Sequence, residues 1–186
     1  MRKKDISDIL SLDTKFKTHY VQYIFQCILA TLTILAILIF LDVVTEAALI
    51  TALGASAFIT FTTPHQYSSD PRRLLGGYLV GLAVGFCLFL IAHNSTITVM
   101  LTHNTTSLVL FGSIAVGISI FIMSITNTEH APAAGIALGL VINNWDYLTI
   151  VYIILAILWL VFIKIALKKY LINLISPHVF QSTSKK

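Results

Sequence analysis

The chain has 186 residues, of which 57% are hydrophobic and 11% are charged, and its formal net charge at pH 7 is +4. Soluble domains carry about a quarter charged residues, so this composition excludes an ordinary soluble domain and indicates an integral membrane protein. The length accommodates about six membrane spans with their connections, and no separate soluble domain in addition. The positive charge gathers near the two ends and in one central loop, which is typical of a topology signal and not of a nucleic-acid-binding surface.

Residues 1–19 mix charged and apolar side chains. The apolar ones recur at approximate helical spacing, which fits an amphipathic helix on the membrane surface, although a frayed cytoplasmic tail fits equally well. They are Ile6, Ile9, Leu10, Leu12 and Phe16. An uninterrupted apolar run over 20–41 then predicts the first span, with Tyr20 and Tyr23 at one membrane interface. No small-x-small cleavage site follows it, so we expect a retained span and not a signal peptide.

A shorter helix is predicted over residues 47–61, where small residues dominate. At 1.5 Å per residue it would be about 22 Å long, which is less than the roughly 30 Å of the hydrocarbon layer. The apolar run over 74–92 that follows is a full span. Its glycines Gly77, Gly81 and Gly85 come at every fourth position and share one helix face, which predicts a seam where another helix packs closely.

The second half of the chain repeats this order of elements. A span over 108–125 is followed by a second short helix over 131–143 and by a last span over 148–167. Each half thus has a long span, a short helix rich in small residues and a long span. Three crossings in each half would make the second half inverted relative to the first. The pattern therefore suggests inverted three-helix repeats, the plan of many secondary transporters.

The charged residues test the number of crossings. With six crossings, every Lys and Arg of the loops and tails falls on one side of the membrane, as the positive-inside rule expects. The acidic Asp42, Glu46 and Asp146 then lie on the opposite side. This topology predicts an all-α polytopic bundle with a transmembrane domain over 20–169. A cytoplasmic N-terminal segment, 1–19, and a cytoplasmic tail, 170–186, flank it.

The stretch from Thr126 to Asn144 is the most informative part of the sequence. Here Glu129 and His130 lead into Pro132 and a short apolar run, which is typical of a helix start because proline lacks the N–H that the first turn leaves unbonded. Four free backbone N–H groups and the positive end of the helix dipole would then point at the surroundings of His130. A helix end of this kind is suited to holding an anion.

Several short motifs also carry a family resemblance, from about residue 20 to residue 167. They are Gly54-Ala55-Ser56-Ala57, Pro64, Pro71-Arg72 with Gly76-Gly77, and His130-Ala131-Pro132-Ala133-Ala134-Gly135. In these motifs the chain resembles the HPP family of bacterial and plant-plastid membrane proteins. The family is named for a His-Pro-Pro signature, in which Ala131 here replaces the first proline. The resemblance implies about four transmembrane helices, fewer than the charges predict. Some family members look like nitrite transporters, so it also implies transport of a small anion.

We expect the substrate site to be formed by His130, Pro132, Glu129, Gly135, Ser56, His65 and Arg72. An unperturbed imidazole titrates near pH 6.5, so His130 could carry a proton and pair with the anion. Other interpretations stay open. Glu129 and His130 could form a helix cap or a loop salt bridge, and Arg72 could contact lipid headgroups. The acidic residues of the outer face would repel anions and favour a cation or proton pathway.

The sequence thus favours a transporter or channel-like protein for a small inorganic anion, nitrite-like and proton-coupled. The alternative is a structural or accessory membrane subunit without transport activity of its own. No catalytic triad, paired metal ligands or phosphate loop is present, so we expect no enzymatic activity, cofactor or metal. The expected partners are the anion, the lipid bilayer and further copies of the chain in a homo-oligomer, without nucleic acid. The expected location is a bacterial inner membrane.

Overall fold

The computed structural model describes residues 14–41, 47–94 and 104–174, and every regular element within these ranges is helical. The elements are α2 (Thr14–Leu41), α3 (Ala47–Thr62), the 3-10 helix η1 (Tyr67–Ser69), α4 (Pro71–Ala92), α6 (Asn104–Thr126), α7 (Ala131–Ile142) and α8 (Tyr147–Leu167). The predicted all-α membrane bundle is confirmed. The expected surface helix and most of the expected C-terminal tail lie outside the described residues.

Helix length divides the described bundle into two classes. Four segments are long and apolar enough to cross a membrane: Thr18–Ile37, Pro71–Ala92, Ser107–Thr126 and Tyr147–Leu167. Two apolar helices are shorter, with 16 residues in α3 and 12 in α7. At 1.5 Å per residue, their lengths are about 24 and 18 Å. The four full spans agree with the number that the family resemblance implies, and the two short helices agree with those predicted from the sequence.

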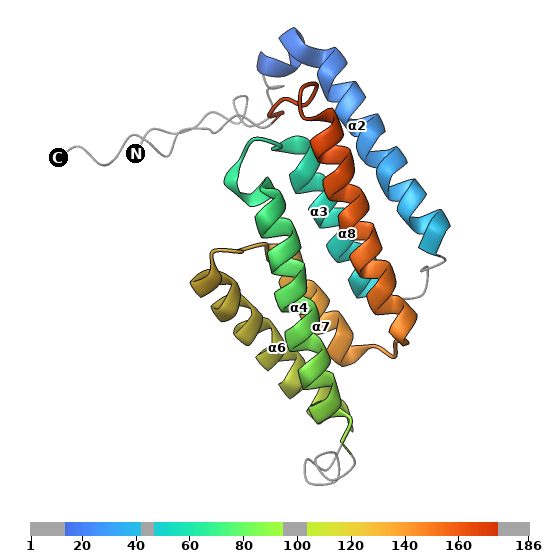
Figure 1. Cartoon of the computed structure of the whole chain (residues 1–186), viewed down its shortest axis with the longest axis vertical. Helices are drawn as coiled ribbons and strands as arrows, with labels where there is room; N and C mark the ends of the chain where they lie inside the picture. Colours follow the sequence, from blue (N-terminus) through green and yellow to red (C-terminus); the bar gives the residue numbers. More distant parts are fainter. Residues whose placement is uncertain (1–13, 42–46, 95–103, 175–186) are drawn as a thin grey trace, which may run out of the picture.

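The helices alternate in direction along the chain. In Figure 1, α2, α4 and α7 run downward, whereas α3, α6 and α8 run upward. The second three helices are therefore reversed relative to the first three. The main helix contacts also match when the halves are exchanged: the pairs α2–α3, α2–α8 and α3–α8 correspond to α6–α7, α4–α6 and α4–α7. The pairs α3–α7 and α4–α8 correspond to themselves. This is the contact pattern expected of inverted three-helix repeats.

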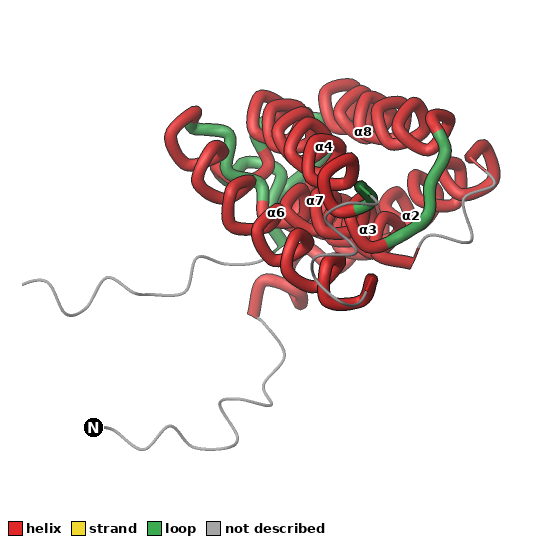
Figure 2. Tube along the Cα trace, turned by 90° about the horizontal axis from the view of Figure 1, so that it is seen from below, coloured by secondary structure: helices red, strands yellow, loops and turns green. Residues whose placement is uncertain are grey.

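The short helix α7 lies at the centre of the bundle, against α3, α4 and α6 (Figure 2). Most of its residues are buried, in agreement with a helix that is apolar on all sides. Large apolar side chains are instead exposed on the outer faces of α2, α6 and α8; Phe121 of α6, for example, is 65% exposed. Such a surface is expected where the surrounding solvent is lipid.

The glycines of α4 form a close contact with α7. A Cβ atom added to Gly77 would lie 2.7 Å from the Cβ of His130, and one added to Gly85 would lie 2.9 Å from the Cα of Ala137. A Cβ on Gly81 would collide with the carbonyl oxygen of Ala133. The predicted glycine seam therefore packs against α7, which is the helix that begins at His130.

The chain after α8 folds back over the ends of α2 and α3. The buried amide of Gln26, in α2, donates hydrogen bonds to the carbonyl oxygens of Phe61 (2.6 Å) and Ile172 (2.9 Å). The N–H of Leu174 donates to the carbonyl oxygen of Thr62 at 2.8 Å. These bonds satisfy carbonyl groups that a helix end leaves open, and packing of the bundle continues to Leu174.

Candidate functional site

The connection between α6 and α7 positions the candidate site. Helix α6 ends at Thr126, and Asn127 takes a left-handed backbone conformation with φ of 58°. The N–H of Thr128 then donates to the carbonyl oxygen of Met123 at 2.9 Å. Asn is one of the few residues other than Gly that adopt this conformation readily at a helix end. The chain therefore turns sharply and re-enters the bundle at His130.

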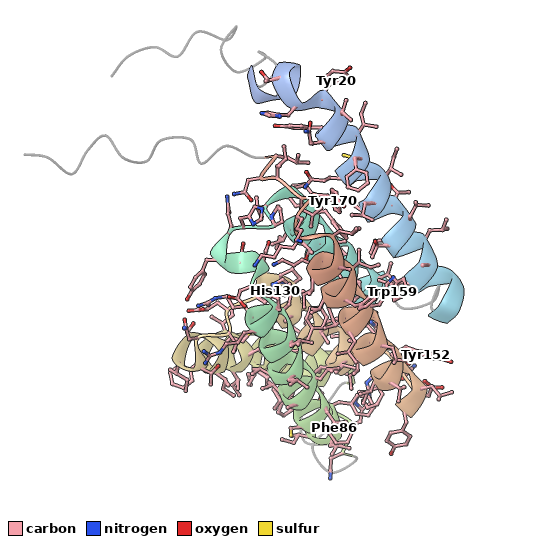
Figure 3. All side chains as sticks on the ribbon, turned by 45° about the horizontal axis from the view of Figure 1, so that its top comes forward. Tyr20, Phe86, His130, Tyr152, Trp159 and Tyr170 are labelled. Atoms are coloured by element: carbon pink, nitrogen blue, oxygen red, sulfur yellow. The ribbon has the colours of Figure 1, made fainter. Side chains whose placement is uncertain are left out.

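His130 is the residue immediately before α7, and its side chain lies inside the bundle (Figure 3), with only 2% of its surface exposed. Its Nε2 atom lies 2.8 Å from Oγ of Ser56, in α3. The same Oγ lies 2.8 Å from the hydroxyl of Tyr78, in α4. The Tyr78 hydroxyl also donates to the carbonyl oxygen of Ala52 at 3.2 Å. One continuous hydrogen-bonded chain thus joins α7, α3 and α4.

The other ring nitrogen of His130, Nδ1, is buried and makes no regular hydrogen bond. Burial lowers the pKa of His130 to about 4, and the nearby backbone of Ser68 opposes this change. The imidazole is therefore neutral at pH 7. A neutral imidazole has one N–H donor and one acceptor nitrogen. The Tyr78 hydroxyl donates its one proton to Ala52, so the Ser56 hydroxyl donates to Tyr78 and accepts from Nε2, which leaves Nδ1 as the acceptor nitrogen of the neutral ring.

The start of α7 offers fewer free N–H groups than the four expected from the sequence. Pro132 has no N–H, and the N–H of Ala133 donates to the carbonyl oxygen of His130 at 2.9 Å. Two of the groups expected to face an anion are therefore not available. Gly135 lies against α3, where an added Cβ would be 3.8 Å from the Cβ of Ala52. The dipole of α7 still directs its positive end toward His130.

Glu129 pairs with an arginine of α4 and not with its neighbour His130. The buried guanidinium of Arg73, 4% exposed, donates to Glu129 and also to Oδ1 of Asn127 at 2.6 Å, and it stacks on the ring of Tyr67. The Tyr67 hydroxyl donates to the same two side chains. A hydrogen bond from its own backbone N–H lowers the pKa of Glu129, and Arg73 and Tyr67 lower it further. The alternative of a loop salt bridge therefore holds for Glu129, whose partner is Arg73, whereas the side chain of His130 makes no hydrogen bond that caps α7.

His65 and Arg72 take structural positions away from His130. The His65 ring bonds through Nε2 to the carbonyl oxygen of Leu171 (2.9 Å), and its backbone N–H donates to Oδ1 of Asn173 (3.0 Å). Arg72 is exposed in the first turn of α4, where its N–H donates to the carboxylate of Asp70 at 2.9 Å. The structure thus brings Ser56 to His130 but keeps His65 and Arg72 apart from it.

Sequence analysis did not select Tyr78, and it left Arg73 out of the final set. The signal for Tyr78 was a single hydroxyl in the middle of an otherwise apolar span. The signal for Arg73 was its position one helical turn before Gly77, on the face that packs against the His130 connection. Among the described residues, no group of three or more His, Cys, Asp or Glu side chains is placed to hold a metal ion.

Comparisons with known proteins agree with this membrane architecture. A family description, the HPP transmembrane region, matches residues 15–177. A transmembrane protein of Dictyostelium discoideum is 32% identical over 90 residues, which cover 48% of this chain and 28% of that protein. No solved structure matches the chain significantly. Because the family match spans most of the sequence, the chain belongs to the HPP family of membrane proteins.

Proposed function

We propose that this protein is a transporter or channel-like protein for a small inorganic anion such as nitrite. We further propose that His130 binds the anion and carries a proton with it. The observation that supports this most strongly is the buried Nδ1 atom of His130 at the start of α7, which makes no regular hydrogen bond. Ionisable groups inside a membrane bundle are costly and usually serve function, and the positive end of a helix dipole favours an anion.

The environment of His130 links anion binding to proton binding. Burial keeps the imidazole neutral at pH 7, and among the described residues no cationic side chain is hydrogen-bonded to its ring. An anion beside the ring would stabilise the imidazolium, and the imidazolium would in turn stabilise the anion. This coupling is reciprocal. On the Nε2 side, the hydroxyls of Ser56 and Tyr78 can rearrange their protons as the ring becomes charged.

The Arg73 network acts as the gate of the site. It joins η1, the first turn of α4 and the connection that ends at His130. Because His130 is only 2% exposed, an anion reaches it only after some part of the bundle opens. The incoming anion would replace the Glu129 carboxylate as the partner of Arg73. This replacement would open the end of the bundle at which η1 and the first turn of α4 lie, and it would draw the anion inward.

Liposome flux tests the proposal. The purified protein is reconstituted, and uptake of nitrite, nitrate, formate and chloride is measured along a concentration gradient. We expect nitrite flux above that of empty vesicles in the wild type and a loss of at least tenfold in His130→Ala. The matched control is His93→Ala, which changes an exposed histidine at the opposite end of α4 and should retain flux.

Flux in His130→Ala equal to that of the wild type would remove His130 from the mechanism. No flux from any form, together with a partner protein that purifies with the chain, would favour the accessory membrane subunit instead. Homo-oligomer formation stays a prediction, which cross-linking in mild detergent tests. The cytoplasmic placement of the basic end also stays a prediction, which accessibility labelling of Lys168 in intact cells tests.

A further inference from the structure

A basic groove lies where the α3–α4 connection meets the end of α8. Its volume is about 370 Å³, within the range of about 300–1,000 Å³ typical of small-ligand sites. The residues that give it chemical character are His65, Tyr67, Asp70, Lys164, Ile165 and Lys168. None of its lining residues belongs to α7 or to the connection before it, and Tyr67 is the residue that it shares with the Arg73 network.

Lys164 is the unusual residue of this groove. It belongs to the last turn of the α8 span, and only 5% of its surface is exposed. Its Nζ atom donates to the carbonyl oxygen of Ser69, at the end of η1. An ammonium group has three N–H donors, so two remain for another acceptor. A neutral donor would satisfy that carbonyl without the cost of burying a charge, so the positive charge itself requires an explanation.

Within the described part of the chain, no anion neutralises this charge directly. Among the residues that the structure describes, neither Lys164 nor Lys168 makes an ion pair within 4.0 Å. Asp70 is close enough to act on Lys164 electrostatically, as is Lys168. The Asp70 carboxylate, however, is bonded to the N–H of Arg72, where it caps the start of α4. The groove therefore holds two ammonium groups and one engaged carboxylate, and it is suited to an anionic ligand.

The surroundings of the groove indicate a ligand with an apolar part. Lys164 lies in the last turn of α8, and Lys168 is the residue that follows the helix, four positions later. Ile165 lies between them in sequence, lines the groove and is 59% exposed. Phe162, one turn earlier, is also 59% exposed on the outside of the bundle. An apolar surface thus leads from the groove along α8 toward the lipid. The end of α8 and the α3–α4 connection lie at the same end of the bundle (Figure 1), and the basic residues Arg72, Lys168 and Lys169 belong to or adjoin these segments, as is typical of a membrane interface.

We propose that this groove binds the phosphate group of an anionic membrane lipid, with Lys164 and Lys168 as its cationic ligands and the acyl chains along the exposed face of α8. The two remaining donors of Lys164 contact phosphate oxygens at the floor of the groove. Lys168 closes the groove from the side of the headgroup. The proposal does not depend on anion transport, because its cationic ligands, Lys164 and Lys168, take no part in the His130 site.

Lipid binding to the solubilised full-length protein tests the proposal. The protein is titrated with phosphatidylglycerol, phosphatidylcholine or inorganic phosphate in a non-ionic detergent, and the rise in Tm is measured together with the lipid retained in native mass spectra. We expect phosphatidylglycerol alone to raise the Tm. A lysine near a lipid surface contributes about 1 kcal/mol, so Lys168→Gln should weaken the apparent affinity about fivefold.

The matched control is Lys169→Gln, which removes the adjacent exposed charge outside this groove and should change the affinity less than twofold. Lys164→Gln should abolish the lipid-dependent rise in Tm. Because this buried variant also risks misfolding, the decisive comparison is between the variants at 168 and 169. Equal affinities in these two variants, or an equal response to phosphatidylcholine, would overturn the proposal. A full response to inorganic phosphate would overturn the assignment to a lipid and assign the groove to a soluble phosphate.

Discussion

The contact between α4 and α7 at Gly81 leads to a sharp prediction for the variant Gly81→Ala. An added Cβ would collide with the carbonyl oxygen of Ala133 and would lie 3.2 Å from its carbonyl carbon. Both are backbone atoms in the first turn of α7, so neither can rotate away as a flexible side chain would. The two helices must therefore separate, and the start of α7 must move relative to α4.

The expected magnitude follows from two opposing terms. Adding a methyl group to a tightly packed interior costs about 1–3 kcal/mol, and a collision with backbone places this variant at the upper end, about 3 kcal/mol. Alanine is better than glycine inside a helix by about 1 kcal/mol, which offsets part of the cost. The net loss of unfolding free energy is about 2 kcal/mol. For a chain of this size, that corresponds to a fall in Tm of about 4–8 °C.

The assay is thermal unfolding in one detergent, followed by the fluorescence of Trp145 and Trp159. The matched control is Gly117→Ala in α6, because no atom lies within 4 Å of a Cβ added there. This variant keeps the gain in helix propensity without the collision, so its Tm should rise by about 2–4 °C. A Tm of Gly81→Ala at or above that of the wild type would show that α4 and α7 are not packed as the structure places them. Equal shifts in both variants would lead to the same conclusion.

Two further predictions concern pH and helix capping. Because burial lowers the pKa of His130 to about 4 and a bound anion would raise it, the apparent affinity for nitrite should improve as the pH falls from about 8 to about 5, by at most about tenfold per pH unit. Liposome uptake should lose this dependence in His130→Gln, and a pH profile unchanged by that variant would contradict the coupling. The carboxylate of Asp146 accepts from the N–H and the hydroxyl of Thr149, both at 2.9 Å, so Asp146→Ala should lower the Tm. Asp146→Asn should keep most of the cap, and equal losses of Tm in the Ala and Asn variants would contradict this role.

The arrangement of the halves explains how a short helix comes to lie inside a membrane protein. Alone in lipid, α7 would be too short to cross the hydrocarbon layer, which is about 30 Å thick. Between α3, α4 and α6, most of its residues from Pro132 to Val141 are buried against protein and not against lipid, and non-standard backbone at membrane depth is tolerated where it is buried in protein. The same enclosure removes water from His130. A central short helix and a buried titratable residue at its start are therefore two results of one packing arrangement.

The pattern of residues along the chain was sufficient to predict where the described helices lie and in which order they follow one another. Local features of the sequence determine where a helix begins and ends and which of its faces carries small residues. Such features here are the apolar runs of span length, the spacing of Gly77, Gly81 and Gly85, and the polar break before Pro132. Ser56 was placed in the same expected site as His130, but no hydrogen bond between them was predicted. His65 and Arg72 were expected in that site too, yet their hydrogen bonds are with Leu171, Asn173 and Asp70, because a basic residue near a membrane interface serves equally well to anchor a chain or to bind an anion.

Only the tertiary structure decided which polar groups meet. Ser56, Tyr78 and His130 come from three helices, and no spacing along the chain brings them within hydrogen-bonding distance. The pairing of Arg73 with Glu129 and the burial of Lys164 against η1 likewise depend on how helices from the two halves pack. Helix formation in lipid follows from each segment separately, because every apolar run must satisfy its own backbone. The contacts of polar side chains depend on the helices around them, so they are properties of the assembled bundle.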